Sequence, residues 1–181
     1  MDMYKLKWTR LQLEIVRFLS IKAGQDFNLR KVAQALAVSP TAVSNVLEDL
    51  EKDSYISVKK SNTMNLMSIQ LNRDNKKAIE FKRTENLRLI YDSGLADFLY
   101  ELFPGCAIIL FGSYSRGEDV YGSDIDVAVV GMDEKRMELK KYESLLERKI
   151  SINFYKSWAK IHTHLKENII NGITLSGGIE L

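Results

Sequence analysis

Two short apolar runs on either side of a loop rich in glycine and serine place the tightest limit on how this chain folds. The runs cover residues 107–111 and 125–130, and the loop covers 112–123. Apolar runs of this length, bounded by turn residues, are typical of buried strands. We therefore expect a small sheet around them, with helices at 134–147 and 157–170, a third strand at 149–155 and an edge strand after Gly172.

The first part of the chain follows a helical period instead. Apolar residues recur over 9–23 at the spacings that line one face of a helix. Asn28 and Ser39 are suitable N-caps for helices at 29–36 and 40–52, and Pro40 suits the first position of the second of these. Strands at 55–60 and 66–71, joined by a turn at 61–65, complete the pattern. Helix, helix, turn, helix and a two-stranded wing are the order of a winged helix-turn-helix.

The loop that follows the first apolar run has the residues of a phosphate site. Gly112 lets the backbone come close to a ligand because it has no Cβ. If residues 113–116 begin a helical turn, their N–H groups and the helix dipole face a bound triphosphate. Ser113 adds a hydroxyl donor, and Arg116 adds a planar cation that suits phosphate oxygens.

Two carboxylates stand at the start of the second apolar run. Strand side chains alternate, so Asp124 and Asp126 point to one face while Ile125 points to the other. Adjacent negative charges need a cation to neutralise them, and hard oxygen ligands are what Mg²⁺ (or Mn²⁺) binds together with substrate phosphates. The chemistry so placed is in-line attack of a hydroxyl on the α-phosphorus of a nucleoside triphosphate (NTP), with pyrophosphate leaving.

These residues resemble the motif of the nucleotidyltransferase superfamily that includes DNA polymerase beta, in particular its minimal, antitoxin-like members. Phe111-Gly112-Ser113 and Asp124-Ile125-Asp126-Val127 match the motif, and Arg116-Gly117 and Ser123 match within the loop. The resemblance implies catalytic and metal-binding roles for Asp124 and Asp126. It implies contacts to ATP or another NTP from Gly112, Ser113, Arg116 and Ser123. The acceptor hydroxyl would belong to a protein, a nucleic acid or a small molecule.

One feature departs from that family. Its active members usually carry a third carboxylate on a neighbouring strand, but the strand at 149–155 offers Ser151 and Asn153, neither of which can act as a base. Glu147 lies just upstream, although we expect it to belong to the preceding helix. Two functions therefore stay open: a Mg²⁺-dependent enzyme, and a transcription regulator or antitoxin-like protein, with a toxin as partner, whose domain only binds nucleotide.

The predicted fold class is a two-domain protein of mixed α+β and α/β character. A winged helix at 1–73 is followed by connecting helices at 74–104 and by a small, mixed-sheet, nucleotidyltransferase-like domain at 105–181. We expect the winged helix to bind double-stranded DNA through the start of its third helix and through its wing. Dimerisation or protein docking is the alternative role, and a homodimer is expected by analogy with other winged helices. The predicted DNA-binding residues are Ser39, Thr41, Ser44, Asn45, Lys59 and Lys60.

Composition adds limits of a general kind. The formal net charge of +2 favours no particular partner. No apolar stretch reaches the roughly 18 residues of a membrane-spanning helix, so we expect a cytoplasmic protein without a membrane partner. The single cysteine, Cys106, is predicted to be a core residue. His162 and His164, two apart on a predicted helix, should point in different directions and make a poor metal pair.

Overall fold

The computed structural model describes residues 8–60 and 67–178, and the chain divides into two compact units. The units are Met1–Lys82 and Arg83–Leu181. The division falls inside a long helix, α4 (Lys76–Asp92). The predicted connecting segment, 74–104, is therefore shared between the two units. The predicted turn at 61–65 lies outside the described residues.

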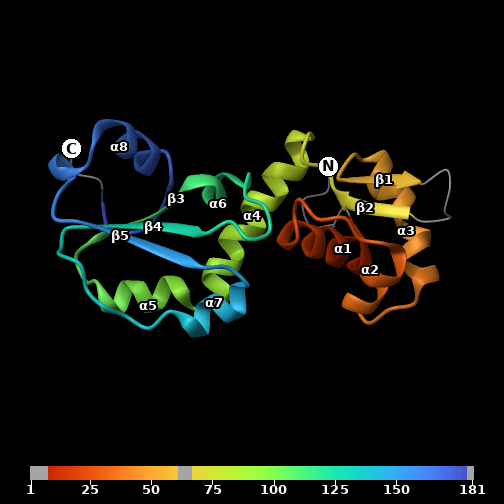
Figure 1. Cartoon of the computed structure of the whole chain (residues 1–181), viewed down its shortest axis with the longest axis horizontal. Coiled ribbons are helices and arrows are strands. Elements are labelled where there is room, and N and C mark those ends of the chain that lie inside the picture. The colour runs from red at the N-terminus through yellow and green to blue at the C-terminus, as the bar shows by residue number, and fades with distance from the viewer. Residues whose placement is uncertain (1–7, 61–66, 179–181) are drawn as a thin grey trace. The chain divides into compact units, whose positions relative to one another are not determined.

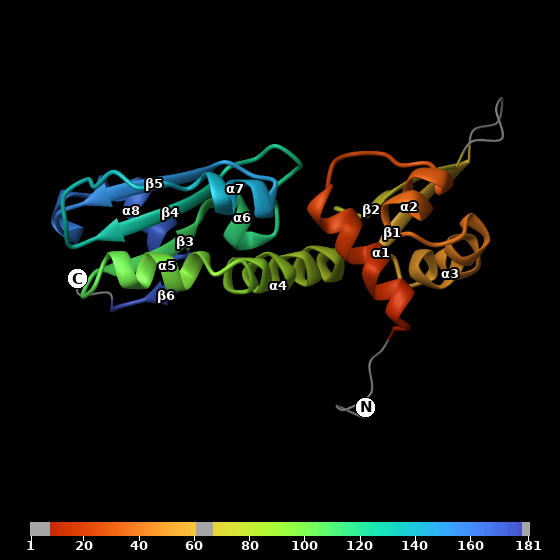
Figure 2. The same cartoon turned by 90° about the horizontal axis from the view of Figure 1, so that it is seen from below.

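The first unit contains three helices and a hairpin. Each of the three helices begins at a polar N-cap residue. The side chains of Thr9, Asn28 and Ser39 accept hydrogen bonds from backbone N–H groups in the first turns, and the last two are the predicted caps. The two strands pair antiparallel, and Phe27 forms an additional bridge to Ile69. Figure 2 shows the hairpin beside the three helices. The elements are α1 (Arg10–Ile21), α2 (Leu29–Ala35), α3 (Pro40–Lys52), β1 (Ile56–Lys60) and β2 (Met67–Leu71).

The core of this unit joins the helices to the hairpin. Leu19, Leu47 and Ile69 are buried in one apolar cluster with side chains from all five elements. The edge of Trp8 packs against the rings of Tyr55 and Phe81, with ring centroids 4.5 and 5.2 Å away. The order of elements and their common core confirm the predicted winged-helix arrangement.

The second unit is built on a four-stranded mixed sheet in the order β5-β4-β3-β6. β3 pairs antiparallel with both β4 and β6, whereas β4 and β5 are parallel. This confirms the predicted small mixed sheet. Its elements are α5 (Leu95–Leu102), β3 (Ala107–Phe111), α6 (Gly112–Arg116), β4 (Ile125–Val130), α7 (Lys140–Leu146), β5 (Ile150–Tyr155), the 3₁₀ helix η1 (Trp158–Lys160), α8 (Thr163–Ile170) and β6 (Ile173–Ser176).

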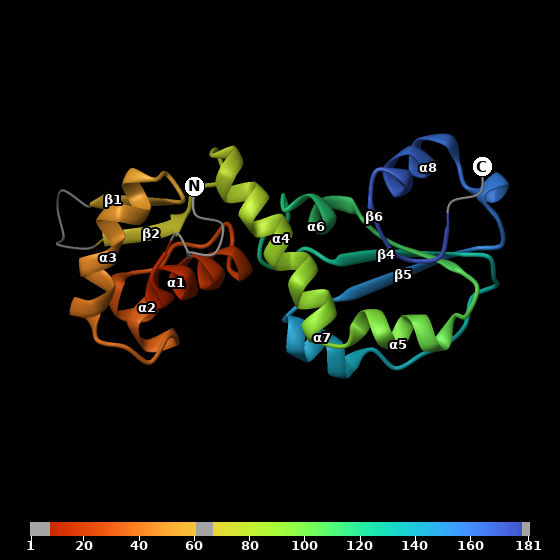
Figure 3. The ribbon, with the colours of Figure 1, turned by 180° about the vertical axis from the view of Figure 1, so that it is seen from behind.

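Helices cover both faces of this sheet. Val127 and Val129 of β4 lie in one core with α5 and α7, and buried Cys106 belongs to the same core, as predicted. Ala128 and Val130 lie in a second core with η1 and α8. Figures 1 and 3 show α8 on one side of the sheet and α5 and α7 on the other. Since side chains alternate along β4, this layering puts Asp126 on the α8 side.

Two predicted helices are shorter than expected. The helix predicted at 134–147 covers only Lys140–Leu146, because Met132, Met137 and Leu139 pack against the core at spacings that one helix face does not provide. The helix predicted at 157–170 divides into η1 and α8, since the backbone at His162 is extended. Among the described residues, no helix is both long and apolar enough to span a bilayer.

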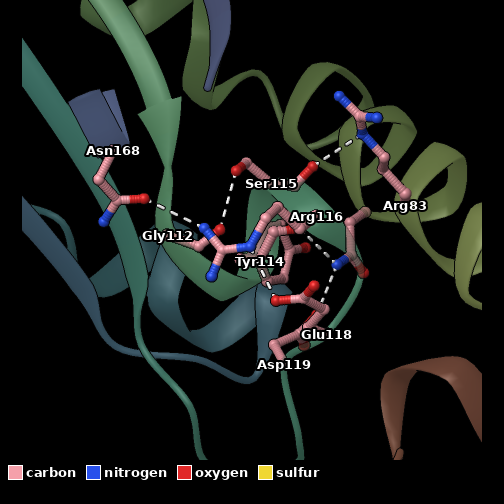
Figure 4. A network of polar contacts seen from close by, with 9 residues as sticks. Arg83, Gly112, Tyr114, Ser115, Arg116, Glu118, Asp119 and Asn168 are labelled. Carbon is pink, nitrogen blue, oxygen red and sulfur yellow. Dashed lines mark hydrogen bonds and ion pairs between the residues drawn. The ribbon is translucent and has the colours of Figure 1, made fainter. Parts of the chain in front are cut away.

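Buried polar side chains anchor the loop between β3 and β4, which the sequence did not reveal. The Asn86 amide donates to the Tyr114 carbonyl at 2.9 Å and to the Asp119 carboxylate at 2.7 Å. Arg148 Nη2 lies 3.7 Å from the same carboxylate, and both side chains of this ion pair are almost fully buried. The Arg83 guanidinium donates to the Ser115 carbonyl at 3.0 Å (Figure 4). The loop is thus tied to α4 and to the start of β5.

Removing the Asp119 carboxylate should destabilise the protein strongly. In Asp119→Ala the buried guanidinium of Arg148 loses its counter-charge, so we expect the free energy of unfolding to fall by about 3–5 kcal/mol. Glu118→Ala is the matched control, since this exposed carboxylate pairs with Arg116 at the surface and should contribute no more than about 1 kcal/mol. Urea denaturation of both variants makes the comparison, and similar small losses would contradict the anchoring role.

Candidate functional site

The loop backbone and the second carboxylate of the predicted motif lie in direct contact. Phe111 at the end of β3 pairs with Asp126 near the start of β4. Gly112 then turns the chain into α6 with φ +73°, and a Cβ at this position would lie 2.6 Å from Asp126 Oδ2. Both the left-handed backbone and the contact require glycine here. The amides that follow Phe111 therefore begin beside a carboxylate.

The two predicted metal ligands form a close, uncompensated pair. Burial raises the pKa of the Asp126 carboxyl above its usual range, and the negative charge of Asp124 raises it further. Within 8–60 and 67–178, no lysine, arginine or histidine forms an ion pair with either carboxylate. Two interacting carboxylates that form no ion pair with a basic side chain of the described residues fit a divalent cation.

The remaining loop residues are placed differently from one another. Ser113 is partly buried in the first turn of α6, next to Gly112. Arg116 is exposed, and its guanidinium pairs with Glu118 at 2.7 Å and donates to Asn168 of α8 at 3.1 Å (Figure 4). Its predicted phosphate contact would have to replace these bonds. The Ser123 hydroxyl accepts from the backbone N–H of Val120 at 3.1 Å. It thus shapes the turn that leads into Asp124.

The neighbouring strand brings a hydroxyl, not a carboxylate, to the site. Ser151 of β5 pairs with Asp126, and Asn153 pairs with Ala128 further along β4. Glu147 ends α7 in a left-handed conformation and is exposed. In the described part of the chain, no three or more His, Cys, Asp or Glu side chains gather in a way that could hold a metal. The site therefore offers two carboxylates.

The predicted DNA-binding residues lie on one helix and one strand of the first unit. Thr41, Ser44 and Asn45 are exposed on the first half of α3. Ser39 is also exposed, and its hydroxyl caps the helix by accepting from Ala42 N–H at 3.1 Å. Lys59 is exposed on β1, and the side chain of Lys60 lies outside the described residues.

Acidic residues further along α3 are partly engaged within the unit. Asp49 accepts from the Gln12 amide at 3.2 Å, and Glu51 accepts from the Val58 backbone N–H at 3.2 Å. These bonds give two of the acids on α3 a structural role. These two acidic residues therefore do not argue against a nucleic-acid contact at the opposite, N-terminal end of the helix.

The expectation that the two histidines point apart is wrong. Their ring centroids lie 5.9 Å apart and the rings are tilted by 31°. The reason is that His162 precedes α8 in an extended conformation, whereas His164 lies within its first turn. The spacing rule for helix faces therefore does not apply to this pair.

A comparison with known families finds a match within the second unit. Residues 93–175 match the family model described as a nucleotidyltransferase domain. This range contains the Gly112 loop, Asp124, Asp126 and the whole of β5. No curated protein matches the sequence.

Solved structures of bacterial regulators resemble part of the chain. They include the adhesin competence repressor AdcR of Streptococcus pyogenes, at 20% identity over 54% of this chain and 69% of that one, with a TM-score of 0.41. ZitR of Lactococcus lactis, a zinc-responsive MarR family member, is 20% identical over 56% and 78%, with a TM-score of 0.38. FabT of Streptococcus pneumoniae, in complex with DNA, is 18% identical over 52% and 62%, with a TM-score of 0.40.

Similarity at these scores supports no statement about function. The order of three helices and a hairpin by itself defines the first unit as a winged helix. The match to the family model and the contact between the Gly112 loop and Asp126 identify the second unit as a nucleotidyltransferase domain. The chain therefore joins an N-terminal winged helix to a C-terminal nucleotidyltransferase domain.

Proposed function

We propose that the second unit transfers a nucleoside monophosphate from an NTP to a hydroxyl acceptor, with Mg²⁺ or Mn²⁺ as cofactor. The observation that carries the proposal is the approach of Gly112 to the Asp126 carboxylate, with room for no Cβ between them. It brings the amides of the loop and the carboxylate pair to one place. Phosphate oxygens and a divalent cation need these two kinds of group together.

Each group has a distinct role in this proposal. Asp124 and Asp126 hold the cation, and the N–H groups at the start of α6 donate to the phosphates. The Ser113 hydroxyl adds a donor to the same phosphates. Bound Mg²⁺ would stabilise the charge that develops on the α-phosphate and the leaving pyrophosphate. The buried bonds of Asn86 and Asp119 hold the loop in place before the substrate binds.

One observation favours binding without transfer as the alternative. Ser151 stands beside Asp126 on β5, where a third carboxylate would have to lie to contact the same cation. A serine hydroxyl or the Asn153 amide cannot take a proton from the acceptor at neutral pH. A nucleotide-sensing or antitoxin-like role would need only the binding half of the site.

A transfer assay separates these functions. Full-length protein is incubated with each of the four α-labelled NTPs, Mg²⁺ and protein, RNA and small-molecule hydroxyl acceptors, while released pyrophosphate is measured. We expect Asp126→Asn to lower the rate by at least about 10-fold, since even changes beyond the direct ligands cost 10- to 100-fold at metal sites. Asp133→Asn, an exposed carboxylate after the end of β4, should leave the rate unchanged.

The outcomes are distinct. NTP binding that depends on Asp126, without labelled product or pyrophosphate, supports the binding role. Folded protein that neither binds nor transfers any of the four nucleotides would show that the proposal is wrong.

For the first unit we propose binding to double-stranded DNA. It is supported by the exposed polar side chains on the first half of α3 and by Lys59 on the adjacent hairpin. In a winged helix the start of this helix enters the major groove, and the wing contacts the phosphate backbone.

Charge reversal on α3 tests the DNA proposal. With a mixed-sequence 30-base-pair duplex at low salt, we expect binding in an electrophoretic shift assay and its loss in Ser44→Glu, which brings a negative charge to the groove. Lys76→Gln is the control, because it lowers the net charge by the same amount as Ser44→Glu but at an exposed position of α4. Lys59→Ala should lower the slope of log K against log salt by about 1. Equal losses in Ser44→Glu and Lys76→Gln would contradict the assigned interface.

A further inference from the structure

The two edges of the sheet in the second unit differ in how well they are closed. β6 forms one edge; it covers four residues, and its pairing with β3 shifts register between Ile108 and Ile109. β5 forms the other edge (Figure 2); it covers six residues without glycine or proline and pairs with β4 in continuous register. Short strands, irregular pairing and proline keep a sheet edge from pairing with another chain. β5 is therefore the edge that is open to a further strand.

The outward backbone groups of β5 belong to its even-numbered residues. The N–H groups of Ile125 and Gly131 donate to the carbonyls at positions 149 and 155, each at 2.8 Å. In a parallel pair, one residue points its N–H and C=O groups to the neighbouring strand, and the next residue points both away. The odd-numbered residues therefore face β4. The outward groups belong to Ile150, Ile152 and Phe154.

One of these three residues is already engaged at the edge. The Ile150 N–H donates to the Glu143 carboxylate of α7 at 3.0 Å. None of the described residues hydrogen-bonds with the outward groups of Ile152 or Phe154. A groove of about 730 Å³ is lined by residues 152–156 together with 132–134 and Lys160. Residues from both faces of β5 line this groove, so it includes the strand edge, where backbone groups need a partner.

The sequence of β5 is complementary to a second copy of itself. Antiparallel pairing about a two-fold axis at Asn153 sets Ile152 opposite the partner's Phe154. Each of these residues then exchanges its free N–H and C=O groups with the residue opposite. A β-branched and an aromatic side chain in opposite positions stabilise a strand pair. Both side chains already pack at the rim of the apolar core that contains α5 and α7, so pairing extends that core across the axis.

The charges at the ends of β5 suit the same register. Lys156 comes opposite the partner's Ile150, whose N–H group is bonded to Glu143. Each copy thereby brings a cation to a carboxylate of the other copy. The present partner of Lys156 is Asp133, at 2.9 Å, and both side chains are exposed, so this ion pair contributes little and can be shared. No like charges lie directly opposite each other between positions 149 and 157.

We propose that two copies of this chain pair through β5, antiparallel about Asn153, and join their sheets into one. The inference goes beyond the proposed nucleotide chemistry and does not depend on it. Pairing would also set the partner's Tyr155 opposite Ser151, which lies beside Asp126 on its other side. The interface thus adjoins the candidate site.

Light scattering after size-exclusion chromatography of the full chain tests the pairing. At about 200 µM we expect twice the 20.8 kDa of one chain, with dissociation on dilution, because an interface of one strand pair is small and weak. Asn153→Asp and Asn153→Lys each bring two like charges together at the axis. Each variant alone should raise the dimer Kd by at least about 10-fold. An equal mixture of the two should restore the dimer, since opposite charges then meet.

Thr174→Asp and Thr174→Lys are the matched controls, because Thr174 is exposed on β6 at the other edge of the sheet. They should leave the dimer Kd unchanged. If an Asn153 variant does not fold by circular dichroism, Lys156→Glu replaces it, since it sets a second negative charge beside the partner's Glu143. A wild-type protein that is monomeric at about 200 µM overturns the proposal. A dimer that persists in the edge variants also overturns it, and would place dimerisation elsewhere, as in the predicted winged-helix dimer.

Discussion

The contact between the Gly112 backbone and the Asp126 carboxylate is the constraint on which the rest of the second unit depends. Antiparallel pairing of β3 with β4 sets Phe111 opposite Asp126, and the left-handed turn at Gly112 then folds the loop onto the carboxylate. Partial burial and the charge of Asp124 disfavour ionisation of Asp126, which raises its pKa. Holding the ionised Asp126 carboxylate in this position costs folding free energy, and a bound cation would offset that cost.

A single buried network supports the loop of the proposed phosphate site. Asp119 accepts from Asn86 of α4 and pairs with Arg148 at the start of β5, while Arg148 lies over Tyr121. Through these contacts the loop that would cradle phosphates is fixed to α4 and to the segment that leads into β5. Binding groups that are already in place lose little conformational entropy when the ligand arrives. The network thus explains why the charged side chains of Asp119 and Arg148 are buried.

Local patterns predicted those features that depend on neighbouring residues. The apolar runs located β3 and β4, and the caps at Asn28 and Ser39 located two helices of the winged helix. Features that depend on distant residues were not predictable. Asn86 of α4 and Arg148, just before β5, are the partners of Asp119, and Arg116 donates to Asn168 of α8. No spacing in the sequence predicts these contacts. The helix predicted at 134–147 is shorter than predicted because of another distant contact. Met137 packs against the core of the second unit from a segment without regular secondary structure.

The most direct test of the shared site is electron paramagnetic resonance of Mn²⁺, which distinguishes bound from free ion. If the carboxylates and the loop amides hold one cation and its phosphates together, Mn²⁺ should bind full-length protein more tightly in the presence of an NTP than in its absence. Gly112→Ala, which inserts a Cβ 2.6 Å from Asp126 Oδ2, should remove most of that gain. Mn²⁺ affinity that does not respond to any NTP, or that responds equally in wild type and Gly112→Ala, would contradict a joint site.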